Sequence, residues 1–116
     1  MIATLQEAGV AVKRDFFSRI LGGTPVDTGQ ARGGWRITLD EPSTDDSVKL
    51  DLTGALGQNA IAAMGKQHAA SMTWYTNNQD YIIELEYGKS GQAPQGMVRV
   101  NIAAFGQIVR SVSGRL

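Results

Sequence analysis

The tripeptide Gly-Lys-Ser at positions 88–90 is the first place where residue types in this chain suggest chemistry, because the phosphate-binding loop of nucleotide hydrolases ends in Gly-Lys-Ser. That loop also needs a glycine five positions before its second glycine, so that successive backbone N–H groups can surround the phosphates. The corresponding residue here is Ile83. Glu84 and Glu86 stand just ahead of the tripeptide, and their carboxylates would repel a polyphosphate. The spacing therefore predicts a turn at 88–90 and no nucleotide site.

Other reactive side chains also fail to form a catalytic group. Glu84 and Glu86 are two apart in a segment with strand character, so both are expected on one side, where acid–base work is conceivable. Because they alternate with apolar residues, a solvated or partner-facing side of a sheet is the favoured interpretation. His68 has no acid at neighbouring helical positions and is expected at the surface near a helix end. Ser90 misses the spacing of a nucleophile elbow by one residue, so no triad is predicted.

Composition argues against a metal site and against a protein whose main task is to bind nucleic acid. The 116 residues include no cysteine and one histidine, which excludes thiolate and histidine-rich metal sites. The acidic stretch 40–46, Asp-Glu-Pro-Ser-Thr-Asp-Asp, lacks the ligand periodicity and central glycine of a calcium-binding EF-hand loop. Eleven basic side chains balance eleven acidic ones and are scattered along the chain, so phosphate neutralisation is not the expected task. No cofactor and no metal are expected.

Length and hydropathy predict one domain over residues 1–116. With 42% hydrophobic and 19% charged residues, the chain can bury a single core. No apolar run approaches the roughly 20 residues of a membrane helix, and the N-terminus lacks the charge and apolar run of a signal peptide. We expect no membrane contact and synthesis in the cytoplasm.

Hydrophobic periodicity predicts the elements of the first half. Apolar residues recur at helical spacing over 2–21, which predicts a helix ending at two glycines, followed by a compact loop at 24–29. Residues 35–39 alternate apolar and polar and predict a strand, after which 40–46 is the expected mobile loop. Val48, Leu50 and Leu52 alternate again and predict a second strand.

The second half adds a helix, a hairpin and a final helix. Thr53 is expected to cap a helix from 55 to about 69. Segments 72–76 and 81–87 are rich in aromatic and β-branched residues and predict an antiparallel pair. After the loop 88–96, apolar residues from Met97 onward repeat at helical spacing. The order predicts an α+β domain with a small, mainly antiparallel sheet packed by N-terminal, central and C-terminal helices.

Two segments together resemble a known family. They are Thr-Pro-Val-Asp-Thr-Gly-Gln-Ala-Arg-Gly-Gly-Trp at 24–35, and the later run Asn-Asn-Gln-Asp-Tyr-Ile-Ile-Glu-Leu-Glu-Tyr-Gly-Lys-Ser at 77–90 with Gln-Ala-Pro-Gln-Gly-Met-Val-Arg at 92–99. In order and spacing they resemble the neck, or tail-completion, proteins of long-tailed double-stranded-DNA phages, across nearly the whole chain. We refer to them below as the first and second signature segments.

The resemblance implies a structural role in the virion neck and no enzyme activity. It implies a ring of six copies that joins the DNA-filled head, at the portal and head-closure proteins, to the tail tube or its terminator. DNA would pass through the lumen of the ring without specific binding. The protein would be made in the host cytoplasm and would end at the head–tail interface of the virion.

Two sets of residues are candidates for contacts within such a ring. A loop that contains proline has little conformational freedom to lose on docking, and large aromatic residues and methionine commonly anchor interfaces. Arg32 is expected to form a partly buried ion pair with Asp27, Glu84 or Glu86. The candidate subunit or partner contacts are Pro25, Asp27, Arg32, Trp35, Tyr87, Lys89, Pro94, Met97 and Arg99. The candidate lumen-facing carboxylates are Asp45, Asp46, Glu84 and Glu86.

Three alternatives remain open at this point. A tail terminator or a head-closure ring would have a similar size and setting in the same machine. A small nucleic-acid-binding module would bind DNA with a steep dependence on salt. A nucleotide-dependent enzyme would require Lys89 to contribute to nucleotide affinity.

Overall fold

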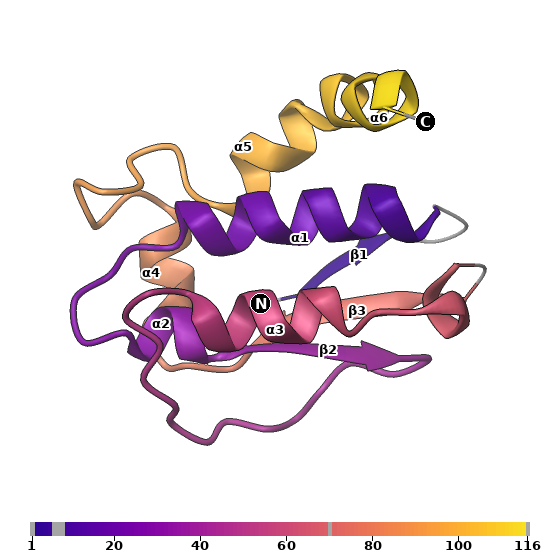
Figure 1. Cartoon of the computed structure of the whole chain (residues 1–116). Coiled ribbons are helices and arrows are strands. Elements are labelled where there is room, and N and C mark those ends of the chain that lie inside the picture. The colour runs from indigo at the N-terminus through magenta and orange to yellow at the C-terminus, as the bar shows by residue number, and fades with distance from the viewer. Residues whose placement is uncertain (1, 6–8, 70, 116) are drawn as a thin grey trace.

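The computed structural model describes residues 2–5, 9–69 and 71–115, and places the side chains of residues 9–69 and 71–114. In chain order the elements are β1 (Ile2–Leu5), α1 (Val10–Gly23), α2 (Gln30–Gly33), β2 (Trp35–Leu39), α3 (Ala55–Ala62), the 3-10 helix η1 (Lys66–His68), β3 (Thr73–Asn77), α4 (Ile82–Glu86), α5 (Val98–Ala103) and α6 (Phe105–Arg115). Figure 1 shows α1 running between α5 and α6 on one side and the strands on the other.

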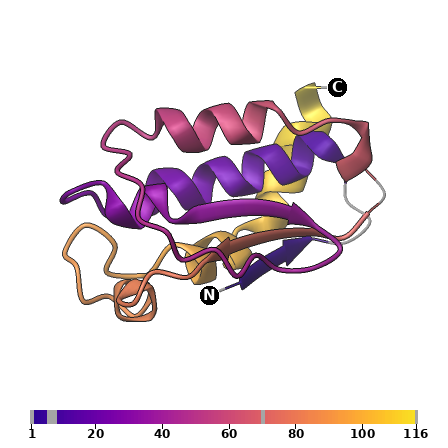
Figure 2. The ribbon, with the colours of Figure 1, turned by 90° about the horizontal axis from the view of Figure 1, so that it is seen from below.

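The strands form one antiparallel sheet in the order β1-β3-β2. β3 is central, with Thr73 opposite Leu5 of β1 and Leu39 of β2. α1 contacts α3, α5 and α6, and α3 contacts β2. Figure 2 shows the same sheet from below, with α1 and α3 side by side next to it. The predicted α+β architecture with a small antiparallel sheet and helices from the N-terminal, central and C-terminal parts is confirmed.

An aromatic stack joins α1 to the sheet. Phe17 of α1 and Trp35 of β2 each lie flat against Tyr75 of β3, with ring centroids 4.5 and 4.4 Å from that of Tyr75. All three are buried, together with the neighbouring α1 residues Phe16 and Ile20. Stacked rings bury large apolar areas and add a directional preference, so this stack sets how α1 lies across the strands.

The predicted N-terminal helix over 2–21 is wrong in its first part. Ile2–Leu5 is a strand paired with β3, and α1 begins at Val10. A segment of four residues carries too little periodicity to separate strand from helix, and here pairing with the free edge of β3 decides. Residues 6–8 of the predicted helix lie outside the described residues, whereas the helix is confirmed from Val10 onward, and Gly23 is its last residue.

The predicted strand at 81–87 is also wrong, because residues 82–86 form helix α4. Its buried residues are Ile82 and Glu86, four apart, whereas Ile83 and Tyr87 are exposed. The period is therefore helical even though the residue types favour a strand. Strand propensity reflects packing against neighbouring strands, and none of the strands in the described part of the chain pairs with this segment. The predicted hairpin 72–76 with 81–87 is thus replaced by β3 followed by a helix.

Two further boundaries differ from expectation. Val48, Leu50 and Leu52 lie outside any strand, and the central helix ends at Ala62, with Lys66–His68 as a separate 3-10 turn. The C-terminal helix is divided into α5 and α6 around Ala104. None of the helices that the structure describes is long and apolar enough to cross a membrane.

A buried lysine ties α1 to the chain between η1 and β3. The side chain of Lys13 is fully buried, and its ammonium donates hydrogen bonds to the carbonyl oxygens of His68 and Ser71 (2.7 Å for Ser71) and to the Thr73 hydroxyl at 3.1 Å. Burial lowers the pKa of Lys13. Three oxygen acceptors offset part of the cost of removing the charge from water.

The expected surface position of His68 is wrong. The residue is 8% exposed, and its Nδ1 lies 3.2 Å from the Thr73 hydroxyl. Burial lowers the pKa of His68, and the nearby charges of Lys13 and Arg14 lower it further. Nearby cations and low hydration both disfavour the imidazolium.

This arrangement predicts a loss of stability on mild acidification. The unfolded chain binds a proton at His68 near its ordinary pKa of 6.5, while the folded chain binds it only at lower pH. The contribution of His68 to the free energy of unfolding should therefore be fully present above pH 6.5 and should be lost progressively as the pH drops toward 5. Urea unfolding at pH 7, 6 and 5 measures this.

The matched control is His68→Asn, which retains a polar group but does not titrate. Because His68 is the chain's single histidine, the pH dependence between 7 and 5 should be weaker in the variant. Equal slopes for both proteins would contradict the assignment.

Candidate functional site

The two signature segments meet at one end of the molecule. The side-chain amide of Gln92 makes two hydrogen bonds with the backbone of Val26, accepting from its N–H and donating to its carbonyl, each at 2.9 Å. A hollow of about 410 Å³ lies between the segments and is lined by Asp27, Tyr81 and Leu85 among others. We call it the α4 hollow. Burial raises the pKa of Tyr81, and the Asp27 carboxylate raises it further.

The first signature segment is organised around the C-terminal end of α1. The Thr24 hydroxyl donates to the Ile20 carbonyl and accepts from the Trp35 indole N–H at 3.0 Å. Arg32 donates to the carbonyls of Thr24 and Gly22 at 3.0 and 3.3 Å. The expected Arg32 ion pair is therefore wrong, since its guanidinium binds backbone carbonyls at a helix terminus, where a cation is favoured.

Close backbone packing explains the glycines of this segment. Gly29 has φ 89°, a conformation disfavoured for other residues, and its carbonyl accepts from the N–H of Asp51. A Cβ on Gly33 would lie 1.7 Å from the carbonyl oxygen of Lys49. Residues 49–51 are thus fitted against α2.

Asp51 also links this segment to α3. Its carboxylate accepts from the N–H groups of Leu56 and Gly57 at 3.2 and 2.9 Å. The Thr53 hydroxyl accepts from the N–H of Ala55 at 3.3 Å, but the N-cap residue of α3 is Gly54, so the predicted Thr53 cap is wrong by one position. Asp51 is 3% exposed, so the carboxylate caps α3 from within the fold. These bonds explain why 48–52 does not join the sheet: its backbone and its one buried side chain are already bonded to α2 and α3.

Glu86 is the central residue of the second signature segment. Its carboxylate accepts from the backbone N–H groups of Met97, Val98 and Arg99 at 2.6, 2.8 and 3.0 Å, and from Nε of Arg99 at 3.2 Å. The residue is 2% exposed. A carboxylate bonded to the free N–H groups at the start of a helix satisfies donors that the helix itself cannot.

This position corrects the expectation that Glu84 and Glu86 share a face. Glu84 points to solvent and pairs with Lys89 at 2.7 Å, where both side chains are more than half exposed. In a helix, residues two apart lie on nearly opposite sides, whereas in the predicted strand they would have been together. Glu86, as a buried cap, does not line a lumen in this fold.

The tripeptide at 88–90 ends α4. Gly88 has φ 88°, and its N–H donates to the Leu85 carbonyl, while the Lys89 N–H donates to that of Glu84. This is the pattern by which a glycine terminates a helix. The expected turn is confirmed, although a helix and not a strand precedes it. Helix carbonyls, which repel anions, face this turn, so the geometry does not suit a phosphate.

Arg99 links the buried cap to an exposed aromatic side chain. Its Nη2 donates to the Glu86 carbonyl at 2.6 Å, and its guanidinium carbon lies 4.4 Å from the centre of the Tyr87 ring. Tyr87 is 69% exposed. A cation over an aromatic face is an attractive contact, and it orients Tyr87 at the surface.

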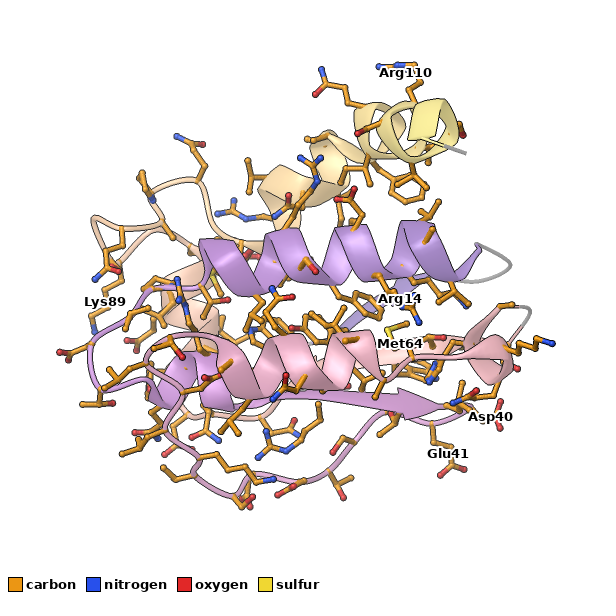
Figure 3. All side chains as sticks on the ribbon, in the orientation of Figure 1. Arg14, Asp40, Glu41, Met64, Lys89 and Arg110 are labelled. Atoms are coloured by element: carbon orange, nitrogen blue, oxygen red, sulfur yellow. The ribbon has the colours of Figure 1, made fainter. Side chains whose placement is uncertain are left out.

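The predicted contact residues separate into three groups by exposure. Pro25, Trp35 and Met97 are buried and belong to the interior of the single chain. Arg32 is half-buried. The exposed members are Asp27, Tyr87, Lys89, Pro94 and Arg99. Of these, Asp27 lines the α4 hollow, and Lys89 lines a smaller hollow beside it. Figure 3 places Lys89 at this end of the molecule and Asp40 and Glu41 at the opposite end.

The acidic loop 40–46 has several attachments that the sequence did not suggest. Asp45 pairs with Arg36 at 3.0 Å and accepts from the Ser47 N–H. Bonds from Ser47, and then the Arg36 guanidinium, hold the pKa of Asp45 well below its usual range. Asn78 donates to the Ser43 carbonyl and Gln79 to that of Asp46. Asp45 and Asp46 remain exposed.

Arg36 makes its attachment from β2, whereas Asn78 and Gln79 belong to a polar stretch, 77–80, that resembles an ordinary hairpin link. Arg36, Asn78 and Gln79 were therefore missed as structural contacts. Amide side chains between two regular elements are a weak signal for loop contacts, because the same residues are common in unattached turns.

A second depression lies between β2 and α3. It has a volume of about 390 Å³, and Arg36, Lys49, Leu56 and Met64 are among its lining residues. Figure 3 shows Arg14 beside Met64, whose carbonyl accepts from the Arg14 guanidinium. Among the described residues, no group of three or more His, Asp or Glu side chains could hold a metal ion.

Comparison of the chain with protein-family models, with curated proteins and with solved structures gives no match. Inference about function therefore depends on the site itself and on the residues that carry the resemblance.

The cap predicts unequal effects for two neighbouring glutamates. Glu86→Ala leaves the N–H groups of Met97 and Val98 without a partner inside the fold, and should lower the free energy of unfolding by about 2–4 kcal/mol. Urea unfolding monitored by tryptophan fluorescence measures the change.

Glu84→Ala is the matched control, since it removes the same side chain from the same helix but breaks only an exposed ion pair. The expected change is within about 0.5 kcal/mol. Equal losses for the two variants would refute the capping role.

Proposed function

We propose that this chain is a structural subunit of a phage neck, forming a ring of six copies that joins the DNA-filled head to the tail. The observation that carries the proposal is the Gln92–Val26 pair of hydrogen bonds, which brings the two signature segments together. The residues that carry the resemblance thus build one feature of the fold.

Exposed contact residues on well-bonded loops support a role in assembly. Tyr87 is oriented by Arg99, and Lys89 follows directly on the glycine that ends α4. Loops that are ordered before association lose less entropy when they dock. Exposed aromatic and arginine side chains are also the types most often found at the centres of interfaces.

The charge distribution supports a lumen that does not bind DNA tightly. Formal charge is balanced over the whole chain, and Asp45, Asp46 and Glu84 remain exposed. Carboxylates near passing phosphates are repulsive and reduce adhesion. We propose these three as lumen-facing carboxylates, and no longer include Glu86.

Electron microscopy of a lysate tests the function directly. The gene is disrupted in the phage that encodes it, and a plasmid copy serves as the control. We expect filled heads beside complete, unattached tails, with joined particles restored by the plasmid, because the ring that joins them is absent.

Other outcomes assign other roles. Abnormally long tails would show a terminator, and empty heads that have lost their DNA would show a head-closure ring. Normal infectious particles would reject the neck role altogether.

A further inference from the structure

One short segment of the chain exposes three large aliphatic side chains to solvent. Val48, Leu50 and Leu52 are 60%, 60% and 59% exposed. We call residues 48–52 the aliphatic segment. The sequence pattern is that of a half-buried strand, yet the side that a strand would bury faces outward. Three large aliphatic residues on one short stretch are unusual for a surface that meets only water.

The segment is held from its inner side. Asp51 is bonded through its N–H to the Gly29 carbonyl and through its carboxylate to the start of α3, and the Lys49 carbonyl packs on Gly33. A loop fixed in this way presents its aliphatic side chains without the entropy cost of ordering on contact. The outward position is therefore built into the fold.

Lys49 gives the segment a charge. It is exposed, and among the described residues it forms no ion pair. A lysine flanked on both sides by exposed aliphatic residues fits a partner surface that combines apolar area with a carboxylate.

The α4 hollow has those features. It adjoins a shallower hollow of about 300 Å³, and the two share Tyr81, Leu85 and Ser90. Asp27 lines the first and Glu84 the second. Asp27 is exposed and forms no ion pair within the described part of the chain.

We propose that the aliphatic segment of one copy docks into the α4 hollow of a second copy, with Lys49 paired to Asp27. The inference rests on the proposed function in requiring association between identical subunits, and it names the contact. The segment and the hollow are different surfaces. Repeating an unlike contact of this kind around an axis closes a ring when the rotation permits.

A charge-reversal experiment tests the pairing. Lys49→Glu and Asp27→Lys each place like charges across the contact, and each alone should weaken self-association, measured by analytical ultracentrifugation, by about tenfold. Neither residue has an internal ion pair, so folding should be preserved, as circular dichroism can verify.

Mixing the two variants should restore assembly. Every contact between a Lys49→Glu copy and an Asp27→Lys copy joins opposite charges, in both directions. Lys66→Glu is the control, because it reverses an exposed cation on η1, away from the contact. Loss of association with no recovery on mixing, or an equal loss in the control, would overturn the pairing.

Crosslinking covers the case in which the free protein associates weakly. The chain has no cysteine, so Leu50→Cys and Ser90→Cys copies, mixed at high concentration and oxidised, can form only introduced disulfides. We expect a mixed dimer from this pair, and none above background from Leu50→Cys with Lys66→Cys. Equal yields from both pairs, or no dimer from either, would reject the contact.

The two proposals fail separately. Disulfide formation and charge rescue with normal particles after gene disruption would retain the contact and reject the neck role. Unattached heads and tails after disruption, without crosslinking or rescue, would retain the neck role and reject this contact.

Discussion

The carboxylate of Glu86 is the interaction on which the second half of this fold depends. It closes the start of α5 by accepting three backbone N–H groups. The cap joins the end of α4 to the start of α5, and so fixes both ends of the loop 88–96. Gly96 must be a glycine here, because φ is 83° and a Cβ would lie 2.4 Å from the Glu86 carbonyl oxygen. The signature residues are thus explained by a structural requirement.

The same principle recurs elsewhere in the molecule. Lys13, Arg32 and Asp51 each direct a charged group toward backbone atoms, and the charge is satisfied by carbonyls or N–H groups. Hydrogen bonds to charged groups are stronger than those between neutral ones. A sheet of three short strands offers few ladder bonds, so these contacts connect the loops and helices that the sheet does not reach.

This construction also accounts for the surface that remains. Because the inner sides of the aliphatic segment and of the loop 88–96 are already bonded, their outer sides are free for other contacts. Tyr87 and Leu50 are exposed on ordered backbone. The ring that we propose would need such preformed surfaces, since each copy must meet its neighbours in one orientation.

Periodicity and residue type were sufficient to predict α1 from residue 10 onward, β2, β3, the start of α3 and the turn at Gly88. These are local features, set by apolar spacing, β-branched content and glycine. The α+β class followed from them. The candidate contacts Asp27, Tyr87 and Arg99 were also identified from the sequence, and the structure leaves them exposed.

Tertiary structure alone decided the rest. Residues 82–86 have strand-like composition but form a helix, because no strand that the structure describes pairs with them. Residues 2–5 form a strand because they pair with an edge of β3 that β2 leaves free. Glu86 caps α5, which begins 12 residues later at Val98, and Asp51 caps α3, which begins 4 residues later at Ala55. Sequence patterns report local spacing, whereas pairing, burial and capping at a distance depend on which surfaces the folded chain brings together.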